Sequence, residues 1–157
     1  MTNFIIIYYL SRVSQRRWGV VQLSNKVVIK FLDGTIMRGV TNDFVPVREN
    51  FHIIYRDDDT DKIKEVSVPV MKAIFFVRDF YGKKEGDKHA SAPKRVPGDV
   101  GKRVKVTFPD GEVISGYTYS FRQDELGFFL FPMDEADNNQ RIFVVIRNVS
   151  KMEEETR

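Results

Sequence analysis

The stretch Lys26-Val-Val-Ile-Lys-Phe31-Leu-Asp33-Gly34-Thr-Ile-Met-Arg-Gly39-Val-Thr41-Asn-Asp-Phe44 decides the fold, because its pattern returns 77 positions later. The second copy reads Arg103-Val-Lys-Val-Thr-Phe108-Pro-Asp110-Gly111-Glu-Val-Ile-Ser-Gly116-Tyr-Thr118-Tyr-Ser-Phe121. A repeat at a fixed period is typical of one supersecondary unit used twice. We therefore expect two similar units, residues 26–80 and 103–150. A unit of about 50 residues is marginally stable alone, so the two should pack together.

Each copy has the pattern of a β-hairpin with an unusual second strand. An apolar, β-branched run at 27–31 and 104–108 predicts the first strand. The Asp-Gly that follows is the strongest short hairpin signal, because Gly adopts a positive φ without steric cost. A second Gly lies inside each return strand, where Gly is expected at a bend, a bulge or a close backbone approach. We assign structural roles to six residues: Asp33, Gly34, Gly39, Asp110, Gly111 and Gly116.

The rest of the chain predicts an all-β protein. Further short apolar runs at 51–55, 66–70 and 73–77, and at 128–131 and 142–146, indicate closely spaced strands. Such spacing favours two tandem small β-barrels of the Sm-like or SH3-like kind, packed as a pseudo-dimer. Phe44 and Phe121 should plug one end of each barrel. A basic Gly/Pro linker, 81–102, should join the units, with a tail or extra strand at 1–25 and a C-terminal tail at 151–157.

The N-terminal run Phe4-Ile-Ile-Ile-Tyr-Tyr-Leu10 is too short to span a bilayer, which takes about 20 residues. Its arginines follow the apolar run, whereas a signal peptide has its basic residues before it. An extra edge strand, a frayed tail and read-through from an upstream start all remain open. An interfacial membrane anchor is the weaker alternative, because the amphipathic pattern is poor. We expect no membrane association.

Charge is divided unevenly along the chain, whose formal net charge is +3. Residues 1–25 carry +3 and residues 81–103 carry +4, whereas 26–80 are neutral and 104–157 carry −4. Nucleic-acid affinity comes mainly from Lys and Arg that neutralise phosphates, so the predicted units are poor candidates for a phosphate-binding face. RNA contact, if any, should be weak and carried by basic residues of the linker: Lys83, Lys84, Lys88, Lys94 and Arg95.

The residues of a catalytic or metal centre are not recognisable in the sequence. There is no Cys, which excludes disulfides and thiol chemistry and fits a cytoplasmic location. The acidic run 57–61 lacks the Gly and Glu spacing of a calcium loop and predicts a solvated hairpin tip. His52 lies in a predicted strand, where a structural, half-buried role is expected. No nucleophile–base set or phosphate loop occurs, so we expect neither an enzyme nor a cofactor.

Two tyrosines are the candidate contacts for a ligand on the predicted units. Tyr117 and Tyr119 flank Thr118, and alternation along a strand places both on one face. We expect the aromatic residues Phe128, Phe129 and Phe131 to lie nearby. The tyrosines would fill the core or the contact between the units, or form a surface that stacks bases or holds a peptide.

The pattern apolar-x-apolar-x-Phe-x-Asp-Gly-x(4)-Gly-x(4)-Phe resembles the first motif of Sm and Sm-like proteins, which has a strand, a Gly turn and a bent second strand. The runs 76–79 and 145–148 resemble in part the Ile-Arg-Gly of the second Sm motif. Val45 and Arg122 replace the Asp that follows the aromatic residue in the first motif, so no RNA-contact residue is transferred. Across 26–150 the chain also resembles uncharacterised bacterial proteins that repeat an Asp-Gly…Gly…Phe unit.

These observations favour a non-catalytic binding or interaction module with a protein partner. An Sm-like RNA-binding protein is the first alternative, and a small-molecule-binding or enzyme domain is the second. A basic face formed by the units themselves would favour RNA. A deep pocket with two carboxylates of perturbed pKa would favour an enzyme.

Overall fold

The computed structural model describes residues 24–82, 101–119, 121–134 and 136–155. The described chain is all-β, as the sequence predicts. The strands of residues 24–82, here called the first unit, are β1 (Asn25–Phe31), β2 (Ile36–Thr41), β3 (Asn50–Asp57), β4 (Thr60–Ser67) and β5 (Met71–Val77). Those of the second unit, residues 101–155, are β6 (Lys102–Thr107), β7 (Val113–Thr118), β8 (Gly127–Leu130), β9 (Asn139–Val145) and β10 (Lys151–Glu154). A 3₁₀ turn precedes β5 and another precedes β10.

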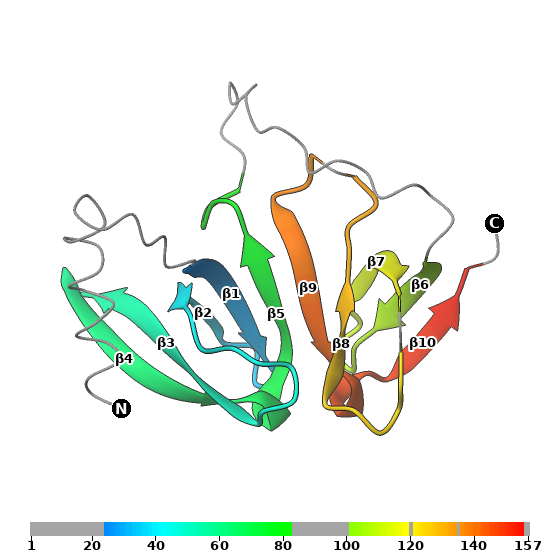
Figure 1. Ribbon diagram of the computed structural model, residues 1–157, viewed down its shortest axis with the longest axis horizontal. Helices are drawn as coiled ribbons and strands as arrows, with labels where there is room; N and C mark the ends of the chain where they lie inside the picture. Colours follow the sequence, from blue (N-terminus) through cyan, green and yellow to red (C-terminus); the bar gives the residue numbers. More distant parts are fainter. Residues whose placement is uncertain (1–23, 83–100, 120, 135, 156–157) are drawn as a thin grey trace, which may run out of the picture.

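The strands form two sheets, ordered β4-β3-β2-β1-β5-β9-β8 and β10-β6-β7. A single pair, Tyr117 with Phe131, connects β7 to the end of β8 and links the two sheets. The corresponding contact in the first unit is also a single pair, Val40 with Ile54, between β2 and β3. The strands thus follow one another across the molecule, from β4 at one end to β10 at the other (Figure 1).

Neither sheet closes into a barrel, so the prediction of two small barrels is not confirmed. Closing the first unit would need β4 to reach β5 on the far side of its sheet. The free side of β5 is instead taken by β9 of the second unit, in an antiparallel pair that runs from Ala73–Val144 to Phe76–Arg141. Pairing between the units therefore replaces closure within each of them.

The two strands of this junction are apolar on both faces, as expected for strands covered on each side. All seven residues of β5 are buried. Ile74 and Phe76 belong to one core cluster with Phe143 of β9, whereas Phe75 belongs to the other with Val144. Each core therefore contains side chains from both units, so neither residues 24–82 nor residues 101–155 bury their apolar surface alone.

The glycines that the repeat singles out have two different roles. Gly34 and Gly111 have φ of +88° and +87°, and a Cβ at either position would meet nothing within 4 Å, so they are turn residues in the left-handed region. Gly39 and Gly116 instead lie against a neighbouring backbone. A Cβ on Gly39 would lie 2.3 Å from the Ile54 carbonyl oxygen, and one on Gly116 would lie 2.4 Å from that of Phe131. A close approach of β2 to β3, and of β7 to β8, explains why Gly recurs there.

The predicted C-terminal tail is a strand for most of its length. β10 pairs with β6 from Lys151–Thr107 to Glu154–Val104. Ser150 N–H donates to the Thr107 carbonyl at 2.9 Å, and Glu155 N–H donates to that of Arg103 at 2.8 Å. The segment contains a single apolar residue, Met152, so its sequence lacks the alternation by which a strand is predicted. No helix in the described ranges is long and apolar enough to span a membrane.

Candidate functional site

The two tyrosines that the sequence pairs have different surroundings in the structure. β7 ends at Thr118, so Tyr119 lies one residue beyond the strand. The Tyr117 backbone exchanges two hydrogen bonds of 2.8 Å with Phe131, and its side chain is half-buried. Tyr119 is 49% exposed and its ring packs edge-on against that of Phe131, 5.3 Å away. The basic linker candidates Lys83, Lys84, Lys88, Lys94 and Arg95 lie outside the described residues.

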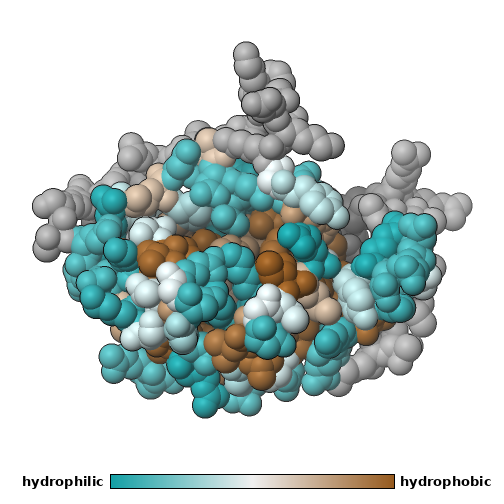
Figure 2. All heavy atoms as spheres, turned by 180° about the vertical axis from the view of Figure 1, so that it is seen from behind, coloured by the Kyte–Doolittle hydropathy of each residue, from teal (hydrophilic) through white to brown (hydrophobic). Residues whose placement is uncertain are grey.

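Tyr119 stands at a cavity of about 280 Å³. The lining is dominated by aromatic side chains of the second unit, with Pro46 contributed by the first. Its residues are Pro46, Thr118, Tyr119, Glu125, Gly127, Phe128, Phe129, Phe131 and Phe143. Glu125, which is exposed, is the one ionisable carboxylate in this lining. Hydrophobic residues are also visible on the face shown in Figure 2, in the middle of the molecule between hydrophilic ends.

Arg141 of β9 lies over two aromatic rings, one of which, Phe129, lines the cavity. Its guanidinium carbon is 4.4 Å from the ring centroid of Phe76 and 5.1 Å from that of Phe129. Burial lowers the pKa of Arg141, although a guanidinium remains charged at neutral pH. Within the described residues this side chain has no hydrogen bond or carboxylate partner, so the ring faces are its main favourable contacts.

Phe44 connects the cavity to the core of the first unit. It lies in the loop between β2 and β3, and its ring contacts Phe51 at 5.2 Å, Phe76 at 5.5 Å and Phe143 at 5.1 Å. Phe121, its counterpart in the repeat, contacts Phe128 at 5.2 Å. Both residues therefore pack on the strand that follows them. Phe44 also reaches across the junction to Phe143, and it holds the loop that brings Pro46 to the cavity.

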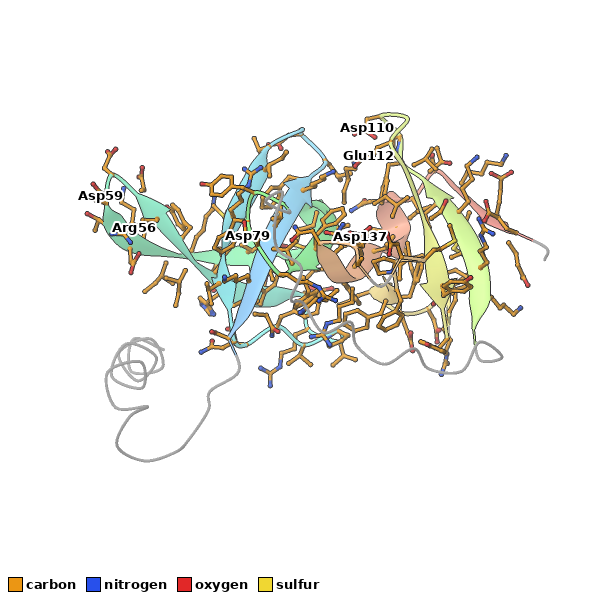
Figure 3. The ribbon with its side chains drawn as sticks, turned by 90° about the horizontal axis from the view of Figure 1, so that it is seen from above. Arg56, Asp59, Asp79, Asp110, Glu112 and Asp137 are labelled. Carbon is orange, nitrogen blue, oxygen red and sulfur yellow. The ribbon has the colours of Figure 1, made fainter. Side chains whose placement is uncertain are left out.

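An ionic cluster holds the β6–β7 hairpin against the first unit (Figure 3). Lys72, with only 6% of its side chain exposed, donates to Asp110 at 2.7 Å and also to Glu112. Lys30 donates to Glu112 as well. The ammonium of Lys72 lies 4.9 Å from the ring centroid of Phe108. Asp110 therefore does more than shape its turn, because it also fixes the position of the second unit.

The pKa values in this cluster move in the directions expected of ion pairs. Burial opposes the charge of Lys72, but hydrogen bonds to Asp110 and Glu112 outweigh it and raise its pKa. The Lys72 hydrogen bond is the main cause that lowers the pKa of Asp110. Burial raises that of Glu112, yet Lys30 and Lys72 together bring it below its usual value. Asp33, the counterpart of Asp110, has its pKa lowered chiefly by a hydrogen bond from the Thr35 side chain.

The remaining polar candidates have structural roles. His52 is half-buried, with Nδ1 2.7 Å from Asp43 Oδ2, and its backbone N–H donates to the same carboxylate at 2.9 Å. The acidic run 57–61 forms the turn between β3 and β4, where Asp58 and Asp59 have φ of 47° and 60°. Asp59 and Arg56 lie at this outer tip in Figure 3. In the described part of the chain no three His, Asp or Glu residues are grouped so as to hold a metal ion.

Sequence reasoning places Tyr119 near the phenylalanines of 128–131, which line the cavity with it, and misses Pro46 and Phe143. Phe143 reads as a strand residue and Pro46 as a loop residue, and only the pairing of β9 with β5 shows that they meet at one cavity. The signal in the sequence was the density of Phe at 128–131, close to the two tyrosines. Lys72 was also missed, because a lone Lys before an apolar strand resembles any solvated residue.

A family model described as a family of unknown function, DUF6982, matches residues 23–155. Neither the curated proteins nor the solved structures include a significant match to this chain. Because the model covers most of the sequence, the chain belongs to this family.

Proposed function

We propose that this member of a family of unknown function is a non-catalytic binding module, and that its cavity accepts an apolar side chain from a protein partner. The observation that carries the proposal is the exposed ring of Tyr119 beside an aromatic cavity between the units. A large apolar ring that remains half exposed loses water contact when a partner covers it, and Tyr and Phe are common anchors of protein interfaces.

The size of the cavity favours a side chain over a cofactor. Small-molecule sites occupy roughly 300–1,000 Å³ and bury most of their ligand. At about 280 Å³ this cavity is slightly smaller. One aromatic or branched aliphatic side chain is therefore the better match, anchored while the rest of the partner lies on the surface.

The charges favour a protein over RNA. Glu125 lies at the cavity, where its carboxylate would repel a phosphate and attract a basic residue beside the anchor. The guanidinium of Arg141 already lies over the rings of Phe76 and Phe129. RNA binding by an Sm-like module remains the alternative that the aromatic lining allows, because a base can stack on such rings. The Sm-like or SH3-like character of each unit is part of this proposal, supported by the Asp-Gly hairpins and by Gly39 and Gly116.

The carboxylates also support a non-catalytic role. The sign of an enzyme named above is a pocket that holds two carboxylates of perturbed pKa. The two with lowered pKa at the junction, Asp110 and Glu112, are held by lysines and do not line the cavity. Glu125 therefore has no acidic partner in the lining.

The proposal is tested by calorimetric titration with the tripeptide Lys-Trp-Lys and, separately, with a single-stranded oligouridine. Tyr119→Ala should weaken the peptide about fivefold, since an aromatic contact of this kind is worth about 1 kcal/mol. Tyr119→Phe should bind as the unchanged chain does. Tyr81→Ala is the matched control, because Tyr81 is 87% exposed and does not line the cavity.

Charge reversal separates the two classes of partner. Glu125→Lys should weaken the tripeptide and strengthen the oligouridine. Tight, salt-tolerant oligouridine binding that is lost in Tyr119→Ala would instead support the RNA alternative. Peptide binding that Tyr119→Ala leaves unchanged would refute the proposed site.

A further inference from the structure

The junction between the units joins two different strand edges. β5, the fifth strand of the first unit, pairs with β9, the fourth strand of the second. The same two kinds of edge occur once more, at the ends of the molecule: β4 is the outer fourth strand and β10 the outer fifth strand (Figure 1). A contact between two different edges leaves one edge of each kind free, so further molecules can add to it. A two-fold symmetric contact occupies the same edge on both molecules and stops at a dimer.

The surface beside β10 resembles the surface that β5 presents to β9, but in the described residues no strand pairs with its outer edge. By register, Ile146, Val149 and Met152 correspond to three residues of the first unit, Val68, Met71 and Ile74. The first-unit residues are 0% exposed. Their second-unit counterparts are only partly buried.

A cavity of about 450 Å³ lies at this surface. Phe121 and Phe128 line it together with Met152. In the first unit the corresponding rings are Phe44 and Phe51, and Phe143 of the neighbouring unit packs against Phe44. Among the described residues, the second unit has no such neighbour in that position.

Transferring the junction register to the two edges brings one pair of opposite charges together and, past the register shift at its end, places Glu155 opposite Asp61. The pair Phe76–Arg141 of the junction corresponds to Glu154 on β10 and Ile63 on β4. The adjacent pair places Glu153 opposite Lys64. Opposite charges directly across a strand pair stabilise it.

The backbone groups of both edges point outward at the same positions. Glu155 N–H donates to Arg103 of β6, so alternation turns the Glu154 N–H away from β6. Val68 N–H donates to Glu49, so the same alternation turns the Ile63 N–H away from β3. Ile63 is also 45% exposed.

We propose that the β10 edge binds the β4 edge of a second copy of this chain, head to tail, in the register of the β5–β9 junction. Charged edge strands also discourage uncontrolled pairing, so this contact is weaker than the apolar junction and depends on concentration. A heterologous contact does not stop at two copies, which distinguishes it from an ordinary symmetric dimer.

Sedimentation of the full chain over a wide concentration range tests the proposal. The average mass should rise with concentration past that of a dimer. Ile63→Pro removes the outward N–H of β4, and Glu154→Pro removes that of β10. Each variant alone should be monomeric, and an equal mixture should form a dimer and nothing larger, because one intact edge of each kind remains. Ile63→Thr and Glu154→Gln keep the N–H and should assemble as the unchanged chain does.

A charge swap provides a test that does not depend on proline. Lys64→Glu and Glu153→Lys should each weaken assembly about two- to fivefold, and the two changes in one chain should restore it. Circular dichroism checks that every variant is folded. A chain that stays monomeric up to about 1 mM, where even a millimolar contact is half formed, overturns the proposal. So does a proline mixture in which the variants do not pair.

Discussion

Replacing Gly39 with Ala should destabilise the protein clearly, although Ala differs from Gly by one methyl group. The new Cβ would lie 2.3 Å from the Ile54 carbonyl oxygen and 2.7 Å from the Ile53 Cγ1. Ordinary C···O contacts are about 3.3 Å or longer, so the overlap is close to 1 Å and a backbone must move. Val40–Ile54 is the one residue pair between β2 and β3, and it is adjacent to this position.

The expected cost follows from three contributions. Overpacking costs about 1–3 kcal/mol. Weakening the strand contact costs about 1 kcal/mol for each hydrogen bond lost. Ala also restricts the unfolded chain more than Gly does, which offsets about 0.4–1 kcal/mol of the lost stability. The net loss should be about 2 kcal/mol, which lowers the melting temperature by about 4–8 °C in a chain of this size.

Gly34→Asn is the comparison that distinguishes steric overlap of a new side chain from the effect of a positive φ. Gly34 has φ of +88° and open space around it, and Asn tolerates the left-handed region better than most residues. This change should cost less than about 1 kcal/mol. Gly116→Ala should behave as Gly39→Ala does, because its Cβ would lie 2.4 Å from the Phe131 carbonyl oxygen. Urea unfolding followed by circular dichroism measures all three. The reasoning is refuted if Gly39→Ala unfolds with the unchanged chain, or if Gly34→Asn is the most damaging of the three.

The other predictions concern the contacts between the units. Glu112 has a lowered pKa in the folded state, so its ion pairs stabilise the fold at pH values above its unfolded pKa. This stabilisation is lost as the pH falls through the folded pKa. Thermal melts of Glu112→Gln should therefore vary less between neutral and acid pH than those of the unchanged chain, and an equal dependence would contradict the ion-pair account. Phe44→Ala should cost about 2–4 kcal/mol and Phe121→Ala about 1–2 kcal/mol in urea unfolding, because Phe44 also contacts Phe143 across the junction; equal losses would argue against that contact. Asn148→Ala should cost about 1–3 kcal/mol, since its side chain donates to the Pro69 and Met71 carbonyls at 2.8 Å and 2.7 Å, and an unchanged melt would show that water replaces both bonds.

The sequence predicts the local elements well because their causes are local. Asp-Gly between β-branched runs specifies a hairpin, and β2 and β7 begin and end 77 positions apart, in the register of the repeat. The interior glycines were expected at a bend, a bulge or a close approach. The choice among these depends on a carbonyl oxygen from β3 or from the end of β8, which no local pattern contains.

The arrangement of the units could not be read from the same signals. A fully apolar strand such as β5 fits a closed barrel and an open sheet equally well, because both bury its two faces. Its partner is set by which free edge fits best, and that edge belongs to β9, in the other unit. β4 and β10 are polar enough to resemble loops, and they become strands because β3 and β6 offer them backbone hydrogen bonds.

The candidate site depends on the same long-range pairing. Tyr119 could be proposed from its surroundings in the sequence. Pro46 reaches the cavity only because Phe44 docks on Phe143 in the other unit. The role of Lys72 at the junction is seen only when the β6–β7 hairpin places Asp110 against it.

The most direct test of the central claim is an amide chemical-shift map of the isotope-labelled full chain during titration with the tripeptide Lys-Trp-Lys. The proposed function predicts that the largest saturable shifts occur at residues around Tyr119 and Phe131 and at the Pro46 loop, which lie far apart in sequence and meet at one cavity. Shifts confined to the linker or the outer strands, with none at the cavity, would contradict it.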